Sequence, residues 1–332
     1  MEAMRAIVQE GYGPPDVLRP AEVPRPVPAA GEVLLRVRAA GVDRGTWHAM
    51  TGRPYAVRLA LGLRGPRSRV AGLDVAGTVV ALGEGVTGFA VGDEVYGVAR
   101  GSFAEYATAR ADRIAPKPAR LGFEEAAVVA VSACTALRGL RDAGRVRPGQ
   151  RVLVVGASGG VGTYAVQLAK AFGAEVTGVC SAAKADLVHS IGADRVIDYA
   201  REDFAADGRR WDLVLDIGGS SPLSRLRRAL TPRGTLVIAG GEDAGDWIGM
   251  GRQFGALALS PFVRQRLAVL FAAPRRADLD TLNGLIEAGS LTPVVGATYG
   301  LDAVPEAVRR LAAGQARGKT AITIAPAERD AS

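Results

Sequence analysis

The chain has 332 residues, of which 48% are hydrophobic, 23% charged and 5% aromatic, and 43 are glycine. This composition suits a globular protein of one large or two ordinary domains, and two cysteines are too few for a disulfide framework. The net charge of +7 comes from scattered arginines without a run of five like charges, so a nucleic-acid binder is the poorer interpretation. No signal peptide and no apolar stretch of about 18 residues occurs, so we expect a cytoplasmic protein without a membrane segment.

Short strands separated by glycine turns dominate the N-terminal part of the chain. We expect strands at 4–9, 33–39, 74–82, 94–99 and 102–108, and a short helical or turn-like piece at 43–52. The segment 14–28 has too many prolines for a helix or an inner strand, so it is expected as an extended edge or a loop. This pattern predicts a mainly antiparallel β domain.

The pattern changes near residue 121, where helices begin to alternate with strands. Helices are expected at 123–131 and 134–143, followed by alternating elements at 152–155, 161–172, 176–180, 183–191, 195–197, 212–216, 223–230 and 235–239. Such alternation predicts βαβ units and a parallel sheet. An irregular region then reaches residue 261, and a strand at 267–271, helices at 277–288 and 304–312 and a strand at 321–324 end the pattern. These last elements can rejoin the first domain and make it discontinuous.

The most informative stretch is a tight small-residue turn between the strand 152–155 and the helix 161–172. It reads A-x-G-x-x-G and contains Ala157, Ser158, Gly159, Gly160, Val161 and Gly162. A strand, a glycine turn and a helix form a dinucleotide site, because the backbone can approach a pyrophosphate at the helix N-terminus. The alternative is a glycine-rich turn without a ligand, since Ala157 stands where the first glycine is usual.

The residue that follows the next strand indicates which dinucleotide is bound. An Asp or Glu about 20 residues beyond the glycines would bind the adenine ribose of NAD, but Ser181 stands there, with Lys184 three residues later. A hydroxyl and a positive charge suit a 2′-phosphate, so we expect NADPH. Ser181 can also cap the following helix and Lys184 can be a solvated lysine, and neither alternative excludes the first.

Several longer motifs are similar to those of a known family. They are the segments 39–55, 71–97, 101–118, 192–199 and 316–324, together with the glycine turn. The chain resembles the medium-chain dehydrogenase/reductase superfamily, in its zinc-independent quinone oxidoreductase branch. The resemblance implies an α/β protein with a GroES-like β-rich catalytic domain (1–122 and 267–332) and a Rossmann NADP(H)-binding domain with a doubly wound parallel sheet (123–266). It also implies a homodimer.

The resemblance also gives an expectation about metal. Zinc-dependent relatives carry ligands at positions that correspond to Asp43, to the segment 72–74 and to the region near Cys134. Leu73 cannot bind a metal, Cys134 is displaced, and the four-cysteine structural lobe is missing. We therefore expect no metal site.

Candidate catalytic residues lie in the segment 43–55. Similar proteins usually carry Asn at Asp43 and Asp at Thr46, and this chain departs from both. Asp43, Thr46 and Tyr55 are the candidate catalytic residues. The alternative for Tyr55 is an apolar wall of the substrate pocket. His48 is either a hydrogen-bond donor to the substrate or a residue at the surface or behind the site. For the cofactor, the resemblance implies contacts from Tyr199, Gly240, Phe271 and Lys319, with core packing the alternative for Tyr199 and a solvated lysine the alternative for Lys319.

Without a metal, the natural reaction is hydride transfer from NADPH to an electron-poor conjugated carbonyl. A quinone or an α,β-unsaturated carbonyl needs only a well-placed hydrogen-bond donor for the developing negative charge. We therefore expect a small electrophilic substrate and neither nucleic acid nor membrane as partner. Two alternatives stay open: a non-catalytic NADPH-binding protein of the same fold, and a carbonyl reductase of the alcohol dehydrogenase type.

Overall fold

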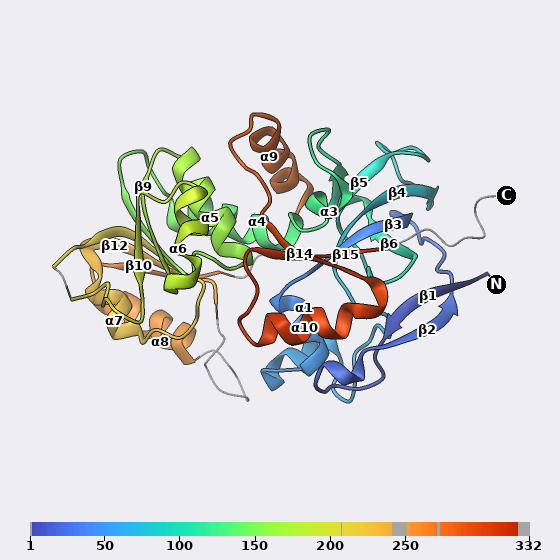
Figure 1. Ribbon diagram of the computed structural model, residues 1–332, viewed down its shortest axis with the longest axis horizontal. Coiled ribbons are helices and arrows are strands. Elements are labelled where there is room, and N and C mark those ends of the chain that lie inside the picture. The colour runs from blue at the N-terminus through green and yellow to red at the C-terminus, as the bar shows by residue number, and fades with distance from the viewer. Residues whose placement is uncertain (1, 207, 241–250, 271–272, 325–332) are drawn as a thin grey trace. The chain divides into compact units, whose positions relative to one another are not determined.

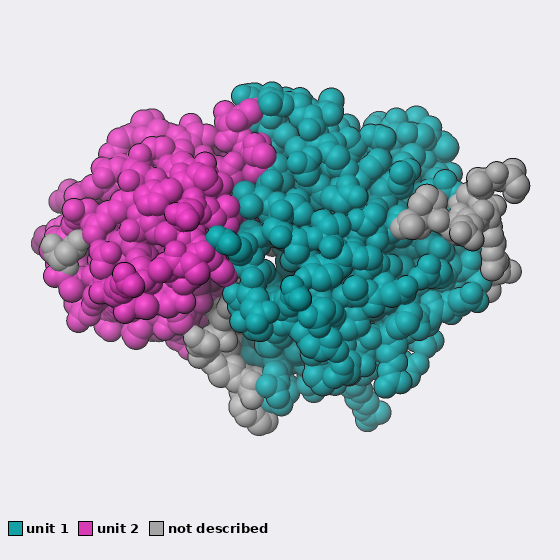
Figure 2. Space-filling view, viewed as in Figure 1, with its two compact units in different colours: residues 1–131, 274–288, 293–332 teal, residues 132–273, 289–292 magenta. Residues whose placement is uncertain are grey.

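The computed structural model describes residues 2–206, 208–240, 251–270 and 273–324 (Figure 1). The chain forms two compact units (Figure 2). Unit 1 contains Met1–Val131, Pro274–Ala288 and Pro293–Ser332, and unit 2 contains Ser132–Ala273 and Gly289–Thr292. None of the helices in the described part of the chain is long and apolar enough to cross a membrane.

Unit 1 is built on a seven-stranded, mainly antiparallel sheet. Its path is β14-β15-β3-β4-β5-β7, with β6 also paired to β3, and a separate β1-β2 ribbon lies outside it. The strands are β1 (Ala3–Val8), β2 (Arg19–Pro24), β3 (Glu32–Val42), β4 (Asp74–Leu82), β5 (Glu94–Val98), β6 (Tyr106–Arg110), β7 (Ile114–Pro116), β14 (Val295–Gly300) and β15 (Lys319–Thr323). Because the C-terminal β15 pairs with β3 through Ala321 and Gly41, the two ends of the chain share one sheet.

The helices of unit 1 connect and cover these strands. They are α1 (Arg44–Thr51), α2 (Arg58–Leu61), α3 (Phe123–Ala126), α9 (Arg276–Glu287) and α10 (Val304–Ala312). The core is apolar and draws on both ends of the chain: Val33 and Leu35 of β3 pack with Val304 and Val308 of α10 and with Ile322. Burial of such side chains drives folding at roughly 25 cal/mol per Å² of apolar surface.

Unit 2 is a six-stranded parallel sheet with its connecting helices. The strands are β8 (Arg151–Val155), β9 (Glu175–Cys180), β10 (Arg195–Asp198), β11 (Trp211–Asp216), β12 (Leu230–Ile238) and β13 (Arg266–Val269), and the helices are α4 (Ala130–Arg138), α5 (Gly160–Ala171), α6 (Ala185–Ser190), α7 (Leu223–Arg228) and α8 (Gly251–Leu259). The spatial order β10-β9-β8-β11-β12-β13 is the doubly wound order of a dinucleotide-binding Rossmann fold. The predicted parallel sheet and the β-rich, GroES-like part are therefore both present.

The unit boundaries differ from the predicted ones in three places, the shortest of which is Gly289–Thr292, a segment of unit 2. Residues 123–131 belong to unit 1, although the sequence pattern assigns them to the Rossmann domain. The segment 267–273 belongs to unit 2, because β13 extends the parallel sheet by pairing Leu267 with Leu236. A short apolar strand carries no mark of the sheet that it joins, so sequence alone placed this one wrongly.

Several elements also differ from their predicted form. The expected irregular region contains α8, and the expected strand 102–108 is β6, shifted to Tyr106–Arg110. The helix expected at 134–143 changes after Arg138 into a π-helical segment, Gly139–Gly144. An added Cβ at Gly139 would lie 3.1 Å from a Leu215 methyl group, so this segment packs closely on β11.

Candidate active site and cofactor site

The glycine turn of unit 2 leaves the first backbone amides of a helix open to a ligand. β8 ends at Val155, Gly156 turns the chain with φ of 89°, and α5 begins at Gly160. Gly159 is the N-cap and supplies no side-chain cap. The N–H groups of a helix's first turn have no intrahelical acceptor, so together with the helix dipole they favour a phosphate group.

Glycine is required at the third position of this turn. A Cβ at Gly162 would collide with the carbonyl oxygen of Gly156 and lie 2.7 Å from the Cα of Ala157. Ala157 itself is fully buried, and its methyl group faces Gly178 of β9, where an added Cβ would be 3.0 Å away. The glycine on the neighbouring strand thus makes room for the alanine that departs from the usual fingerprint.

The predicted adenine end of the site is formed where β9 and β10 end. Ser181 follows β9 and Tyr199 follows β10, and the two strands pair in parallel through Cys180 and Asp198. Ser181 stands at an N-cap position, but its side chain makes no capping hydrogen bond. Tyr199 is 60% exposed, so it is no core residue. Burial raises the pKa of the Cys180 thiol, which Asp198 raises further and Lys184 lowers.

The predicted nicotinamide end contains an arginine that sequence reasoning missed. Gly240 follows β12, and a Cβ there would collide with the Ile217 carbonyl oxygen. Arg252 of α8 donates to Asp216 Oδ2 at 2.6 Å and to the Gly240 carbonyl at 2.9 Å. Burial raises the pKa of Asp216, and Arg252 opposes this shift. Phe271, the other residue predicted here, lies outside the described residues.

In unit 1, Asp43 caps the helix α1. Its Oδ1 accepts hydrogen bonds from the Thr46 N–H at 2.8 Å and from Thr46 Oγ1 at 3.3 Å. The side chain is buried, and Oδ2 has no hydrogen-bond partner among the described residues. Gly52, with φ of 60°, ends the same helix. Asp43 therefore has a structural role as an N-cap, which explains a carboxylate at this position without a catalytic one.

A buried ion pair lies behind this helix start. Lys319 Nζ of β15 is 3.3 Å from Asp74 Oδ2 of β4, and both side chains are almost completely buried. Asp74 Oδ1 also accepts from the Val131 N–H at 2.9 Å. Burial raises the pKa of Asp74 to about 7; Lys319 lowers it and Asp43 raises it. Lys319 thus has a carboxylate partner, in place of the solvated position weighed from sequence, and its contact with a cofactor stays a prediction.

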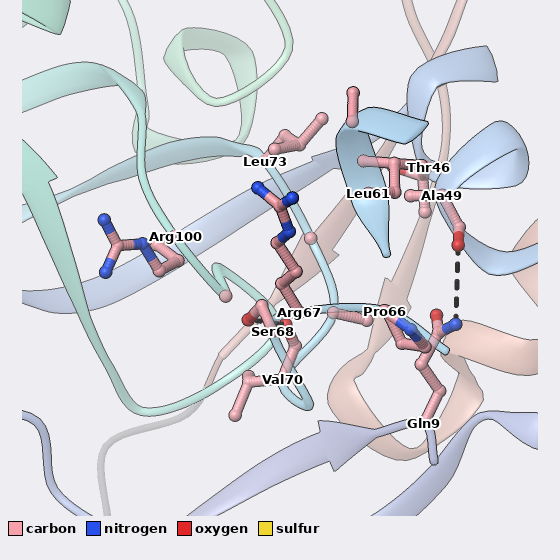
Figure 3. Close-up of a pocket in the computed structure, with 14 residues that line it drawn as sticks. Gln9, Thr46, Ala49, Leu61, Pro66, Arg67, Ser68, Val70, Leu73 and Arg100 are labelled. Atoms are coloured by element: carbon pink, nitrogen blue, oxygen red, sulfur yellow. Dashed lines mark hydrogen bonds between the residues drawn. The ribbon is translucent and has the colours of Figure 1, made fainter. Parts of the chain in front are cut away.

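A cavity of about 400 Å³ opens beside α1 in unit 1 (Figure 3). Its lining is mostly small or apolar: Gln9, Thr46, Ala49, Ala60, Leu61, Pro66, Arg67, Ser68, Val70, Ala71, Gly72, Leu73, Arg100 and Gly101. Of the three candidate catalytic residues, only Thr46 lines this cavity. Asp43 reaches it only through Thr46, and Tyr55 packs instead beneath the Arg58 guanidinium at 4.6 Å. Leu73, in the segment that carries a ligand in zinc enzymes, is part of the wall.

The last features of the candidate site are the hydrogen bond of His48 and the side chains that could bind a metal ion. His48 Nδ1 lies 2.6 Å from the Arg53 carbonyl oxygen, which makes this nitrogen the protonated one, and burial lowers the pKa of the ring. Within the residues that the structure describes, no group of three or more His, Cys, Asp or Glu side chains could hold a metal ion. Cys134 is buried in α4 of unit 2.

Comparison with known proteins identifies the family. A model of the alcohol dehydrogenase GroES-like domain matches residues 29–119, and a model described as zinc-binding dehydrogenase matches residues 191–322. The chloroplast envelope quinone oxidoreductase homolog of Arabidopsis thaliana is 31% identical over 95% of this chain and 97% of its own. The chain belongs to the quinone oxidoreductase-like branch of the medium-chain dehydrogenase/reductase superfamily.

Further relatives agree with this assignment. The human NAD(P)H oxidoreductase RTN4IP1, a mitochondrial protein, is 32% identical over 97% of this chain and 89% of its own. The quinone oxidoreductase from Coxiella burnetii is 29% identical, with a TM-score of 0.84 over 98% of this chain and all of that one. A mycobacterial protein complexed with NADPH is also 29% identical, with a TM-score of 0.81 over 96% of this chain and 99% of that one. As a member of this branch, the protein is an oxidoreductase.

Sequence reasoning missed three features of this oxidoreductase. The Asp74–Lys319 pair joins residues 245 positions apart, and Arg252 lay in a region expected to be irregular. Arg67, one of many scattered arginines, lines the cavity. Only Asp74 carried a signal, a carboxylate before a run of strand residues, because a charge at the start of a buried strand needs a partner.

Proposed function

We propose that this oxidoreductase is a zinc-independent reductase that uses NADPH to deliver hydride to a quinone or an α,β-unsaturated carbonyl. The observation that carries the proposal is the wall of the unit 1 cavity, where Thr46 and Leu73 provide a hydroxyl and an apolar surface. A zinc enzyme needs nitrogen, sulfur or carboxylate ligands at its reacting carbonyl. A conjugated acceptor needs less activation, because its developing charge is delocalised.

The cofactor assignment is supported by the residues of unit 2. The open amides at the start of α5 fit a pyrophosphate, and the Ser181 hydroxyl, which makes no capping hydrogen bond, fits a 2′-phosphate beside Lys184. A relative of 29% identity was solved with NADPH. When bound, the nicotinamide supplies the hydride. We expect at least tenfold tighter binding of NADPH than of NADH; equal affinity would refute the phosphate site.

Thr46 is the donor that we assign to the substrate oxygen. Its hydroxyl now makes a long bond of 3.3 Å to Asp43, which it can exchange for one to a substrate. Asp43 keeps the shorter bond from the Thr46 N–H at 2.8 Å, so the helix start stays in place during that exchange. Asp43 therefore positions Thr46 and does not itself meet the substrate.

Turnover and metal content test the proposal together. NADPH oxidation is followed with 9,10-phenanthrenequinone and with a linear enone, before and after treatment with a chelator, and metal is measured in the purified protein. We expect turnover with at least one acceptor and no loss after chelation. Stoichiometric zinc with chelator-sensitive activity would instead identify a carbonyl reductase of the alcohol dehydrogenase type.

The second candidate is a non-catalytic NADPH-binding protein. One observation favours it: Asp43, one of the candidate catalytic residues, caps α1 through Oδ1 and so has a structural role at this position. Tight NADPH binding without turnover of any quinone or enone would decide for this candidate. The expected homodimer and cytoplasmic location remain proposals as well, and light scattering of the purified protein and localisation of a tagged chain test them.

A further inference from the structure

The cavity of unit 1 has a charge pattern that the proposed reaction does not require. Its lining includes two arginines, Arg67 and Arg100, and no acidic residue. The other lining side chains are neutral, and Leu61, Val70 and Leu73 give it apolar walls. Reduction of a neutral quinone would need only those walls and a hydrogen-bond donor.

Like Arg64, Arg67 has no carboxylate partner among the described residues. Its guanidinium has no hydrogen-bond or ion-pair partner among the described residues. Arg69, two positions later, forms an ion pair with Glu10 at 2.8 Å, and the Arg58 Nε donates to the Gly52 carbonyl at 3.0 Å. Arg100 has only a long contact of 3.5 Å to Glu32. Of the two lining arginines, Arg100 is therefore paired with Glu32, and Arg67 is the one without a carboxylate partner among the described residues.

Hydrogen bonds to the loop backbone hold the segment that carries Arg67 at the wall of the cavity. The Arg67 N–H donates to the Leu61 carbonyl at 2.8 Å, and Tyr12 Oη donates to the Gly62 carbonyl at 2.6 Å. Gly62 has φ of 126°, and a Cβ there would come within 3.5 Å of Arg67 Cγ. In Figure 3 the guanidinium of Arg67 points toward Leu73, while Arg100 points away from the other labelled side chains.

We propose that this cavity selects substrates that carry a carboxylate, which pairs with Arg67, while the hydrocarbon part packs on Leu61, Val70 and Leu73. The proposal rests on the proposed function, because it names the substrate class of the same site. A planar guanidinium binds a carboxylate through two parallel hydrogen bonds. The net charge of +7 also attracts an anionic substrate at long range.

The test compares an acid with its ester. The substrates are trans-4-oxo-2-pentenoate and its methyl ester, which share one enone and differ in the charge. Arg67→Gln removes one of the two cations of the cavity. Arg64→Gln is the matched control, because Arg64 lies in the same loop and is exposed like Arg67, but does not line the cavity. Because Arg67 is exposed and its pairing is screened by solvent, we expect Arg67→Gln to raise KM for the acid roughly fivefold, to leave KM for the ester unchanged, and to reduce the salt dependence of the acid reaction. Arg64→Gln should change neither substrate by more than about twofold.

Binding is also measured without turnover, so that the site and the reaction are judged separately. The probe is 4-oxopentanoate, the saturated acid, titrated calorimetrically into wild-type protein and both variants. Weaker binding in Arg67→Gln alone supports the anion site even if no acceptor is reduced, in which case only the proposed function fails. Equal binding by all three proteins, no binding to wild type, or an equal loss in both variants overturns the anion site, whatever the turnover.

Discussion

At the scale of single residues, Thr46 connects the helix cap to the cavity. Its backbone N–H and its hydroxyl both contact Asp43 Oδ1, and its side chain lines the cavity wall. The Thr46 amide stabilises the start of α1, and we assign its hydroxyl to the substrate oxygen. Substitutions can separate them, because the amide is retained in every variant.

Thr46→Val should lower activity without unfolding the protein. Valine keeps the shape and the capped amide but removes the hydroxyl that we assign to the substrate oxygen. Loss of one such donor costs about 10²-fold or more in kcat, so we expect a fall of that order, with NADPH affinity unchanged. Thr46→Ser, which keeps a hydroxyl, should retain most of the activity. Equal kcat values for the valine and serine variants would remove Thr46 from the mechanism.

The Asp74–Lys319 pair should make stability depend on pH. The pKa of Asp74 is raised from 3.8 to about 7, so between these values the folded state binds more protons than the unfolded state. The free energy of unfolding therefore falls as the pH rises from about 4 to about 7, and it no longer depends on Asp74 at higher pH. In Lys319→Met the carboxyl loses its partner, its pKa rises further, and the fall continues to higher pH.

The comparison of two pH values makes this prediction measurable. At about pH 5.5 Asp74 is neutral in both proteins, so the variant should lose little stability relative to wild type. At about pH 8.5 the variant should be less stable by about 2 kcal/mol, from roughly 1.4 kcal/mol per pH unit above the wild-type pKa. Urea unfolding at both pH values measures the difference. A loss that is the same at both would show that the lysine acts only by packing.

At the scale of elements, two glycines of the turn between β8 and α5 have different roles, one in folding and one in cofactor binding. An alanine at Gly162 would meet the backbone of Gly156 and Ala157, whereas one at Gly159 would meet only the Gly156 carbonyl oxygen, at 3.5 Å. Gly159 has φ of −83°, a value that any residue adopts. We expect Gly162→Ala to lower the melting temperature by several degrees, from a strain of about 1–3 kcal/mol.

Gly159→Ala should lower NADPH affinity and leave the melting temperature unchanged. Its methyl group would stand at the N-cap of α5, where a pyrophosphate would approach the amides of the first turn. The melting temperature should stay close to that of wild type, while NADPH affinity, measured by fluorescence titration, falls at least tenfold. If Gly159→Ala bound NADPH as wild type does, the phosphate would not lie at this turn.

The same elements show what the sequence could and could not predict. The segment 43–52, expected as a helical or turn-like piece, forms α1 between its Asp43 cap and Gly52, and β4 lies where expected, because helix caps and apolar strand runs depend on neighbouring residues in the sequence. The partner of β13 could not be predicted, because its four residues fit an edge of either sheet. β14 was missed, since VGATYG contains two glycines that weaken a strand pattern. The cavity depends on Gln9, Thr46, Arg67 and Arg100, which only the folded chain brings together.

At the scale of the whole molecule, the C-terminal strand β15 is an inner strand of the unit 1 sheet, whose first strand in the sequence is β3. It lies between β14 and β3, pairing with both through Ala321 and Ile322, and it carries Lys319 to Asp74. An inner strand supplies backbone hydrogen bonds on two sides, and two of its side chains, Ala321 and Ile322, are fully buried. Unit 1 is therefore incomplete until the last described strand of the chain has been made.

Two truncations test this dependence. Ending the chain after Gly318 removes β15, leaves β14 without its partner and exposes the unpaired edge of β3, so we expect unit 1 to unfold and the protein to aggregate. Ending it after Ile324 keeps every described strand and should leave melting temperature and activity within error of wild type. Because β8–β13 belong to unit 2, the shorter chain should keep a protease-resistant fragment that contains them. A soluble, cooperatively folded protein ending at Gly318 would show that the N-terminal strands form a stable sheet without the C-terminus.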